Sequence, residues 1–315
     1  MTDPVPRLDP YAAIDVIAER TGVRLRYDGP CAGGEVGAAY VRWPDGTRSV
    51  LTSGRAAAAP LIAVARAAGI LAPGYLLCAG PYVVQELLPG MPPARLDADV
   101  LGQLLAVHDR FAGLLPAGLN ARAGSEDGRP AHSGTAGLNA RAGSEDGRPA
   151  HSGTAGLNAR AGSEDAPLEL FLRRSGPGFC VHETLAAYDG RTQALLRRVR
   201  EAGEDRDVAD GDDLVHLDFH PGNTLFGDGT LTGVVDWDGA GRGDRALDLV
   251  TLRFDVALRN PALLPVLDER LAGLAPDRLR AYWAHMSLRL VDWAIRHHGP
   301  SDVDFWLRVA AASPG

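Results

Sequence analysis

Apolar and polar residues alternate through the first part of the chain, a pattern typical of antiparallel strands. After a short helix over 11–21, strands are expected at "VRLRYDGP", "GAAYVRW" and "RSVLT", with a turn at 44–46. The stretch "GRAAAAPLIAVARAAGI" has helical character that Pro60 should break or kink, and "YVVQELLPG" is typical of a buried strand entering a connector. The pattern predicts a small strand-rich lobe with one helix, followed by a linker.

Beyond the linker, the apolar residues recur mainly at helical spacing. A helix over 97–114 would place one set of side chains on a single face: Leu101, Leu104, Leu105, His108 and Phe111. Further helices are expected over 166–174, 182–203, 244–259, 261–273, 275–298 and 302–312. Between them, "DLVHLD", "TLFGDG" and "LTGVVDWD" indicate short strands, the last two forming a hairpin around a turn at 227–229. An α+β fold is therefore expected, with a larger, mostly helical second lobe.

A tandem repeat interrupts this pattern. "AGLNARAGSEDGRPAHSGT" fills 117–135 and again 136–154, and its first part recurs at 155–165. The unit is rich in Gly, Ser, Asp and Pro and has no apolar face, which predicts a flexible surface insertion rather than a solenoid. The expected organisation is an N-terminal lobe, a hinge with one helix, the insertion and a C-terminal lobe, over 1–88, 89–116, 117–165 and 166–315 respectively.

Composition excludes several classes of protein. Hydrophobic residues make up 45% and charged residues 23% of the 315 positions, which is ordinary for a globular protein. There is neither an apolar run of membrane-spanning length nor a signal-peptide pattern at the N-terminus. Cys31, Cys78 and Cys180 form no CxxC pair, so reduced thiols in a cytoplasmic protein are expected. The net charge of −8 argues against a nucleic-acid partner and is compatible with a cationic small ligand.

The chemistry of the chain concentrates in "HLDFHPGNTLFGDGTLTGVVDWDGAGRGDRALDL", which begins at His216. Asp218, with Asn223 five residues later, matches the kinase catalytic loop H-x-D-x-x-x-x-N, and Asp236 follows the hairpin. In such a site the first aspartate accepts or orients the proton of the attacking hydroxyl. The asparagine and the later aspartate hold Mg²⁺ against the nucleotide phosphates, and hard oxygen ligands suit that ion.

The same stretch resembles the aminoglycoside phosphotransferase and choline kinase-like family, small-molecule kinases with a two-lobed protein-kinase-like fold. The family pattern runs roughly H-G-D-[LF]-H-P-x-N, then [IV]-D-[WF]-[DEG], then G-D-x-x-x-D-[LI]. The matching positions are His216, Asp218, Phe219, His220, Pro221, Asn223, Asp236, Trp237, Asp238, Gly243, Asp244, Asp248 and Leu249. Looser resemblance at "PYVVQELLPG", "LLAVHDRF" and "LRLVDWAIRHH" extends it over most of the chain outside the repeat.

The resemblance implies an ATP- or GTP-dependent phosphotransferase acting on a hydroxyl of a small molecule. Inactivation of an antibiotic is the role that the family most often suggests for such a sequence. A metabolic kinase for choline, homoserine or a sugar would share every residue named. The missing A-P-E segment argues against a protein kinase.

Supporting roles follow from the same motif. His216 is expected to pack the loop, and His220 either to orient a metal-binding carboxylate or to make a loop hydrogen bond. Asp238 is expected at a second metal or in the outer sphere of the nucleotide. Asp244 and Asp248 are expected to brace the loop through backbone hydrogen bonds.

The N-terminal lobe should bind the nucleotide. The loop "AGGEVGA" would fold over the phosphates, with Gly33, Gly34 and Gly37 allowing close approach of the backbone. "QELLPG" matches the hinge between the lobes, where backbone groups near Glu86 and Leu87 would contact the base. Such contacts leave ATP and GTP equally open.

This lobe departs from the family pattern because the chain has no lysine. Thr52 stands where the strand lysine that contacts the α- and β-phosphates is expected, and no acidic residue lies between Asp45 and Glu86 to pair with it. One interpretation is that an arginine replaces the lysine. Arg55 is the first choice, because kinases resembling viomycin phosphotransferase have an arginine-bearing stretch just past this strand.

Arg48 and Arg66 are the other candidates for that arginine, since a guanidinium binds phosphate oxygens in a bidentate manner. The second interpretation is a pseudokinase that binds nucleotide without turnover. The intact set of Asp218, Asn223 and Asp236 favours an active enzyme.

The acceptor should lie between the catalytic loop and the C-terminal helices. Asp292, Asp302 and Asp304 are candidates to meet amino groups there, with solvated helix ends as the alternative.

Overall fold

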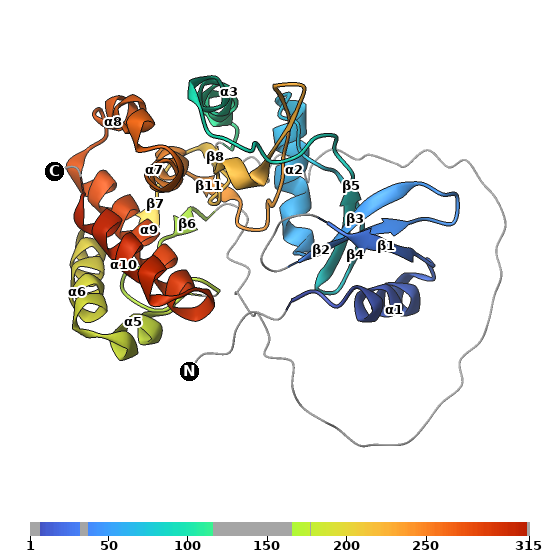
Figure 1. The fold of residues 1–315 in the computed structure, drawn as a ribbon, viewed down its shortest axis with the longest axis horizontal. Coiled ribbons are helices and arrows are strands. Elements are labelled where there is room, and N and C mark those ends of the chain that lie inside the picture. Colours follow the sequence, from blue (N-terminus) through green and yellow to red (C-terminus); the bar gives the residue numbers. More distant parts are fainter. Residues whose placement is uncertain (1–6, 32–36, 116–165, 177, 314–315) are drawn as a thin grey trace, which may run out of the picture.

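The computed structural model describes residues 7–31, 37–115, 166–176 and 178–313. The chain forms two lobes, with the N-terminal sheet on one side and the helices of the C-terminal half on the other (Figure 1). This is the α+β, two-lobed arrangement that the sequence predicts. The tandem repeat over 117–165 lies outside the described residues, so its expected character as a surface insertion stays a prediction.

The N-terminal lobe is built on a five-stranded antiparallel sheet with the order β1-β2-β3-β5-β4. Its strands are β1 (Arg26–Pro30), β2 (Ala38–Arg42), β3 (Arg48–Ser53), β4 (Tyr75–Ala79) and β5 (Tyr82–Glu86). Helix α1 (Pro10–Thr21) begins after Asp9, whose side chain caps it, and buries Ala13 and Ile17 against the sheet. β4 was not anticipated from the sequence.

The helix after β3 joins the two lobes. A 3-10 turn, η1 (Ala56–Ala58), leads into α2 (Ala59–Ala67), so Pro60 begins a helix rather than kinking one. Ile62 of α2 shares a hydrophobic core with residues of the C-terminal lobe, and α2 lies between the sheet and that lobe (Figure 1). Helix α2 thereby fixes the position of the sheet relative to the C-terminal lobe.

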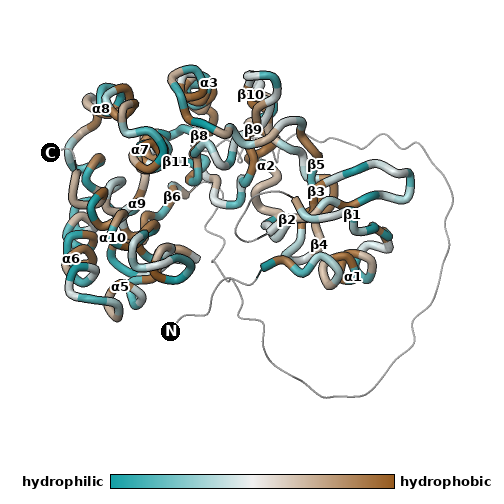
Figure 2. Tube along the Cα trace, in the orientation of Figure 1, coloured by the Kyte–Doolittle hydropathy of each residue, from teal (hydrophilic) through white to brown (hydrophobic). Residues whose placement is uncertain are grey.

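The C-terminal half is mostly helical. Its helices are α3 (Ala98–His108), α5 (His182–Tyr188), α6 (Gly190–Asp205), α7 (Ala246–Arg259), α8 (Leu264–Leu271), α9 (Pro276–His297) and α10 (Pro300–Ala311), with 3-10 turns η2 (Asp109–Phe111), η3 (Pro221–Asn223) and η4 (Pro261–Leu263). Hydrophobic positions recur along α2, α3 and α9, where they face the core (Figure 2). None of the described helices combines the length and the apolar character needed to cross a bilayer.

Short paired strands hold the segment that carries the motif. They are β6 (Leu168–Glu169) with β7 (Val208–Ala209), β8 (Asp213–Val215) with β11 (Gly241–Gly243), and the hairpin of β9 (Thr224–Gly227) and β10 (Thr230–Val234). The hairpin is the one predicted around 227–229. Because β8 and β11 are antiparallel partners, the stretches that follow β8 and precede β11 lie side by side.

The helix expected over 166–174 is wrong. Leu168 and Glu169 pair with β7 instead, and Phe171 has a positive φ of 54°. Asp207 accepts the N–H groups of Leu170 at 2.9 Å and Leu172 at 2.7 Å, so these donors are bound outside any helix. Two buried histidines also hold the segment, because His285 donates from Nδ1 to the carbonyl of Leu170 at 2.7 Å and His182 donates from Nε2 to that of Phe171 at 2.9 Å.

His285 is neutral in the folded protein. Its side chain is buried in α9, and burial, opposed by the bond to Leu170 and reinforced by the charge of Arg289, lowers its pKa to about 4. An unfolded histidine titrates near 6.5, so the unfolded state binds more protons below about pH 6.5. Stability must then fall as the pH is lowered from there toward 4.

We predict that His285→Asn removes part of this acid sensitivity. The asparagine amide can donate to Leu170 but takes no proton. The unfolding free energy of the native protein should therefore drop by about 2 kcal/mol more than that of the variant between about pH 7 and pH 4.5. Denaturant unfolding at a series of pH values measures the difference in unfolding free energy between the native protein and the variant. A difference that does not change with pH would contradict a buried neutral histidine.

Candidate active site

The loop between β8 and β9, residues 216–223, is fastened at its first residue. The ring of His216 is fully buried and donates from Nε2 to the carbonyl of Val235 at 3.0 Å. It packs against Trp237 with 4.6 Å between the ring centroids. Burial lowers the pKa of His216 to about 4, so the ring stays neutral and serves to link the loop to the segment that carries Asp236.

Asp248 braces the same loop from α7. Its two carboxylate oxygens accept the backbone N–H groups of His216 at 2.7 Å and Leu217 at 2.8 Å. Leu217 needs this support because its φ is +70°, a conformation that is unfavourable for a side chain such as leucine. Burial, despite these two bonds, raises the pKa of Asp248 to about 7.

The expectation that Asp244 also braces the loop is wrong. Its carboxylate accepts the N–H of Ala246 at 2.9 Å, the side chain of Arg278 at 3.0 Å and the hydroxyl of Tyr282 at 3.0 Å. Asp244 therefore joins the start of α7 to α9.

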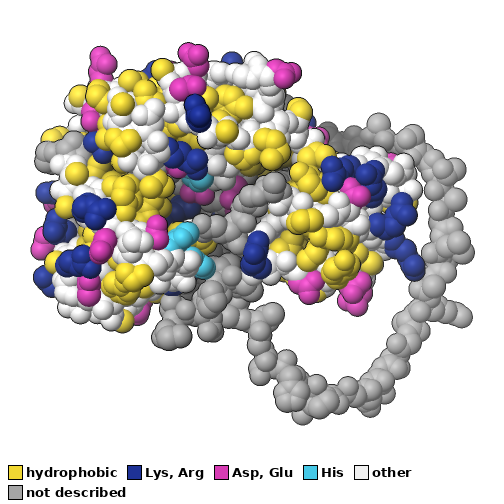
Figure 3. Space-filling view, viewed as in Figure 1, with side chains coloured by type: hydrophobic (Ala, Val, Ile, Leu, Met, Phe, Trp, Pro, Cys, Tyr) yellow, Lys and Arg dark blue, Asp and Glu magenta, His cyan; other side chains and the backbone are white. Residues whose placement is uncertain are grey.

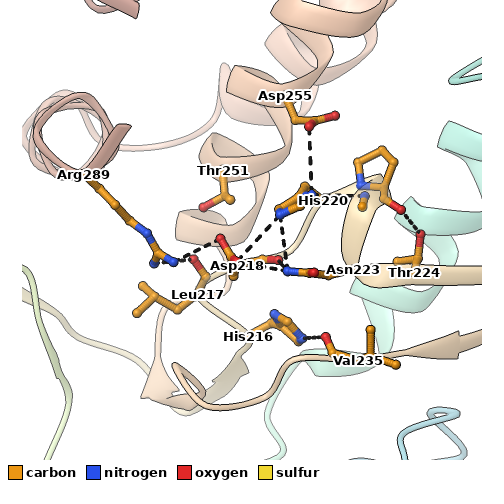
Figure 4. A network of polar contacts seen from close by, with 12 residues as sticks. His216, Leu217, Asp218, His220, Asn223, Thr224, Val235, Thr251, Asp255 and Arg289 are labelled. Atoms are coloured by element: carbon orange, nitrogen blue, oxygen red, sulfur yellow. Dashed lines mark hydrogen bonds and ion pairs between the residues drawn. The ribbon is translucent and has the colours of Figure 1, made fainter. Parts of the chain in front are cut away.

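Asp218 lies at the centre of a polar network (Figure 4). Arg289 donates to its Oδ1 at 3.0 Å, Asn223 donates to its Oδ2 at 3.0 Å, and Nε2 of His220 lies 3.6 Å from Oδ2. Burial opposes ionisation, but the charge of Arg289 and the contact with His220 outweigh it and hold the pKa of Asp218 well below its ordinary value. The group is thus a stable carboxylate, suited to accept a hydrogen bond from a hydroxyl.

The partner Arg289 was missed by sequence reasoning. It lies on α9, 71 residues from Asp218, and also donates to the carbonyl of Leu217 at 3.1 Å. Asp248 accepts the N–H of Leu217 and Arg289 donates to its carbonyl, so both backbone groups of Leu217 are bound. The residue stands within "LRLVDWAIRHH", but nothing in that stretch signals which acid it meets.

Asn223 presents its amide oxygen away from this network. Its Nδ2 donates to both the carbonyl and the carboxylate of Asp218, at 3.0 Å each. With Nδ2 so placed, Oδ1 has no hydrogen bond to another described residue. His220 accepts the N–H of Gly222 at 3.1 Å, which is the loop hydrogen bond expected as one of its two roles, and also lies 3.9 Å from Asp255.

Asp236 differs from Asp218, Asp238 and Asp248 in having no donor to its carboxylate within the part of the chain that the structure describes. Val235 donates to the carbonyl of Asn223 at 2.9 Å, which holds Asp236 beside that residue, and φ of Asp236 is +67°. No hydrogen bond or ion pair from another described residue reaches its carboxylate. The side chain is open to solvent, yet surrounding protein, Asp218 and Asp238 raise its pKa to about 6.

These two residues fit a magnesium ion. Asn223 and Asp236 offer oxygen atoms that no described residue donates to, at a point where carboxylates repel one another. Mg²⁺ takes one or two carboxylates and keeps several waters. No group of three or more His, Cys, Asp or Glu side chains in the described part of the chain could hold a metal, so the fit rests on these two oxygens. Acidic side chains are visible in the hollow between the lobes (Figure 3).

Asp238 connects the motif to the N-terminal lobe. Its Oδ1 accepts the backbone N–H of Arg55 at 3.2 Å and the hydroxyl of Tyr75 at 3.1 Å, while the Arg55 side chain donates to the Asp238 carbonyl at 2.5 Å. Gly54 permits this approach, because a Cβ there would lie 3.2 Å from the carboxylate. The Asp238 carboxylate thus binds two protein donors. A second metal or the outer sphere of a nucleotide was expected at this position.

Of the three candidate arginines, the structure brings only Arg55 to the acidic segment. Arg48 pairs with Asp28 at 2.7 Å. Arg66 pairs with Glu86, which also accepts the N–H of Gly74 at 3.1 Å. Neither member of this pair stands where the family's lysine and glutamate are expected, because Arg66 lies on α2 and Glu86 ends β5.

The remaining predicted residues lie at the hinge and the glycine loop. Leu87 follows β5 with its side chain 39% exposed, and its backbone N–H has no partner among the described residues. Gly37 has a φ of +85°, which glycine adopts without strain. Gly33 and Gly34 lie outside the described residues. Thr52 lies on β3, where its hydroxyl donates to the carbonyl of Ser53.

Of the three acids proposed to meet amines, Asp292 is excluded by burial, whereas Asp302 and Asp304 are at least partly exposed on α10, as the alternative of solvated helix ends expects. Asp292 is fully buried, accepts the N–H of Val181 at 3.0 Å and pairs with Arg296 at 2.9 Å. Asp304 pairs with Arg191 at 2.8 Å. Asp302 accepts the N–H of Gly299 at the start of α10.

Comparison with known proteins identifies what this arrangement resembles. A model of the phosphotransferase enzyme family matches residues 53–284. A solved thermostable mutant of aminoglycoside phosphotransferase APH(4)-Ia without ligand has 17% identity, a TM-score of 0.58, and coverage of 95% of this chain and 97% of that one. A further variant, in a ternary complex with ADP and hygromycin B, has 16% identity, the same TM-score and coverage of 96% and 97%.

A more distant structure is Plasmodium vivax ethanolamine kinase, with 12% identity, a TM-score of 0.51, and coverage of 92% of this chain and 81% of that one. At such identities the likeness concerns the fold, and it confirms the predicted two-lobed, protein-kinase-like architecture. A search of curated proteins gave no match.

We predict that Asp248→Ala destabilises the protein by about 3 kcal/mol, because it leaves two buried N–H groups without acceptors. Asp210→Ala is a matched control. That aspartate pairs with Arg206 at the surface, and its loss should cost under about 1 kcal/mol. Denaturant unfolding measures both values. Equal effects of the two substitutions would mean that the hydrogen bonds of Asp248 do not stabilise the loop.

Proposed function

The chain belongs to the phosphotransferase enzyme family, as its motif predicts, and on that premise we propose that it transfers the γ-phosphoryl group of ATP or GTP to a hydroxyl of a small molecule. The observation that carries the proposal is the convergence of Asp218, Asn223 and Asp236. One amide joins the first two, and a backbone bond places the third beside them. A nucleophile-orienting carboxylate and two metal-binding oxygens at one opening are what phosphoryl transfer requires.

Asp218 is proposed to receive the acceptor hydroxyl. The hydroxyl oxygen forms a bond to the γ-phosphorus, the bond from that phosphorus to the bridging oxygen breaks, and the hydroxyl proton leaves through Asp218. A carboxylate held ionised by Arg289 is a weak base, which suits a loose transition state in which the proton leaves late. Arg289 and Asp248 position this residue through Leu217.

Asn223 and Asp236 are the residues that would hold Mg²⁺. When bound, the ion neutralises charge on the nucleotide phosphates. The unpaired carboxylate of Asp236 supports this role, because a cation would relieve its repulsion from Asp218 and Asp238. A pseudokinase is less well supported, since it has no need of an unneutralised acid at this position.

The donor nucleotide is proposed to lie against the N-terminal lobe. Arg55 takes the place of the missing lysine, because its exposed guanidinium stands at the edge of the lobe next to Asp238. A guanidinium binds phosphate oxygens at two points. The backbone of Leu87 and of the glycine loop that contains Gly37 would contact the base and the phosphates.

The biological role that we favour is inactivation of an antibiotic in the cytoplasm. Its support is that a kinase solved with hygromycin B shares the fold at a TM-score of 0.58. A metabolic kinase is the second candidate, and the ethanolamine kinase structure supports it.

A susceptible bacterium carrying the gene, grown on a panel of antibiotics beside one carrying Asp218→Asn, decides between these roles. We expect the native gene alone to raise the inhibitory concentration of at least one compound, about tenfold or more, because the variant cannot orient a hydroxyl. Equal growth of both strains on every compound would favour a metabolic acceptor.

We further predict that Mg-ATP or Mg-GTP raises the melting temperature of the protein. Ligand at a hundred times its dissociation constant stabilises the native state by about 2.7 kcal/mol. Asp236→Asn should abolish the magnesium-dependent part of the shift, whereas Asp228→Asn, on the hairpin turn, should retain it. Arg55→Ala should weaken nucleotide binding about tenfold and Arg48→Ala hardly at all. No shift with either nucleotide would mean that the missing lysine is not replaced and would contradict the proposed function.

A further inference from the structure

The two groups that donate to the carboxylate of Asp238 carry no charge. They are the backbone N–H of Arg55, at 3.2 Å, and the hydroxyl of Tyr75, at 3.1 Å. The guanidinium of Arg55 is close by, but it donates to the backbone carbonyl of Asp238 and not to the carboxylate. These two described side chains therefore form no ion pair, although they can carry opposite charges.

The surroundings of Asp238 make an ion pair with Arg55 favourable. Its side chain is partly buried, and burial raises its pKa against the opposing effects of the bonds from Arg55 and Tyr75 and of the charge of Arg55. A carboxylate in such a place is stabilised by a guanidinium, which can bind both of its oxygens. If the tyrosine hydroxyl were absent, the carboxylate would therefore compete for the guanidinium of Arg55.

Tyr75 is held where its hydroxyl meets this carboxylate. It is the first residue of β4, and Gly74 before it is bound twice to Glu86 of β5. The N–H of Glu86 donates to the carbonyl of Gly74 at 2.9 Å, and the N–H of Gly74 donates to the Glu86 carboxylate at 3.1 Å. The ring of Tyr75 packs against the core of the C-terminal lobe. Burial and the charge of Asp238 raise the pKa of Tyr75 well above its ordinary value, so the hydroxyl keeps its proton and remains a donor.

We propose, on the basis of the phosphotransferase function above, that Tyr75 is a positioning residue for nucleotide binding. It gives Asp238 a neutral donor and so leaves the charge of Arg55 for the phosphates. Arg55 is exposed, and a guanidinium that binds one backbone carbonyl has further N–H groups to offer. A phosphate attracts a guanidinium more strongly than a neutral carbonyl does, whereas a carboxylate would compete with the phosphate.

The test measures the affinity of the full-length protein for nucleotide, from melting temperatures over a range of Mg-ATP or Mg-GTP concentrations. At about pH 8, where carboxyl groups are ionised, Tyr75→Phe should raise the dissociation constant of the better nucleotide about tenfold. This equals the loss expected for Arg55→Ala, because the guanidinium is then paired with Asp238. The curves without ligand show whether each variant is folded.

Tyr82→Phe is the matched control. Tyr82 lies on the neighbouring strand β5, and no hydrogen bond joins its hydroxyl to another described residue. Its substitution should change the dissociation constant by at most about twofold, because it alters neither Asp238 nor Arg55.

Two further backgrounds separate this role from a purely structural one. In Asp238→Asn the side chain still accepts both bonds but has no charge with which to bind Arg55, so Tyr75→Phe should change the affinity there by at most about twofold. In Arg55→Ala it should likewise have no further effect. A tyrosine that only stabilises the fold would weaken binding equally in every background.

Native affinity in Tyr75→Phe, or a tenfold loss that persists in Asp238→Asn, would overturn the proposal and leave the phosphotransferase function in place. Loss of binding in Asp238→Asn alone would also overturn it, because Asp238 would then act on the ligand directly. A native protein that binds neither nucleotide would refute the proposed function, and this inference with it.

Discussion

Repulsion among acids dominates the centre of this protein. Asp218, Asp236, Asp238 and Asp248 stand within one short stretch, and each meets its charge in a different way. Asp218 has the guanidinium of Arg289, Asp248 has two backbone N–H groups, and Asp238 has donors from the other lobe. Asp236 alone of the four has no donor among the residues that the structure describes. This difference is the reason for proposing that Asp236 binds a cation.

This distribution also couples the two lobes. Asp238 follows Asp236 by two residues, and its partners in the N-terminal lobe are Arg55, which lies just before η1, and Tyr75 of β4. A shift of that lobe must therefore move the peptide next to the proposed magnesium ligand. The chain keeps this coupling without lysine, because a backbone N–H, a tyrosine hydroxyl and an arginine supply the contacts.

The sequence by itself determined the local features. Asp218, Asn223 and Asp236 are held close by a loop and a hairpin whose residues adjoin in the chain, so their spacing alone predicted that they meet. Tertiary structure decided the rest. Arg289 reaches Asp218 from a distant helix, and β7 and Asp207 hold the stretch around Leu170 extended where a helix was predicted. These contacts depend on how distant segments pack together. Such packing has no fixed spacing in the sequence, so the sequence alone does not predict which residues meet.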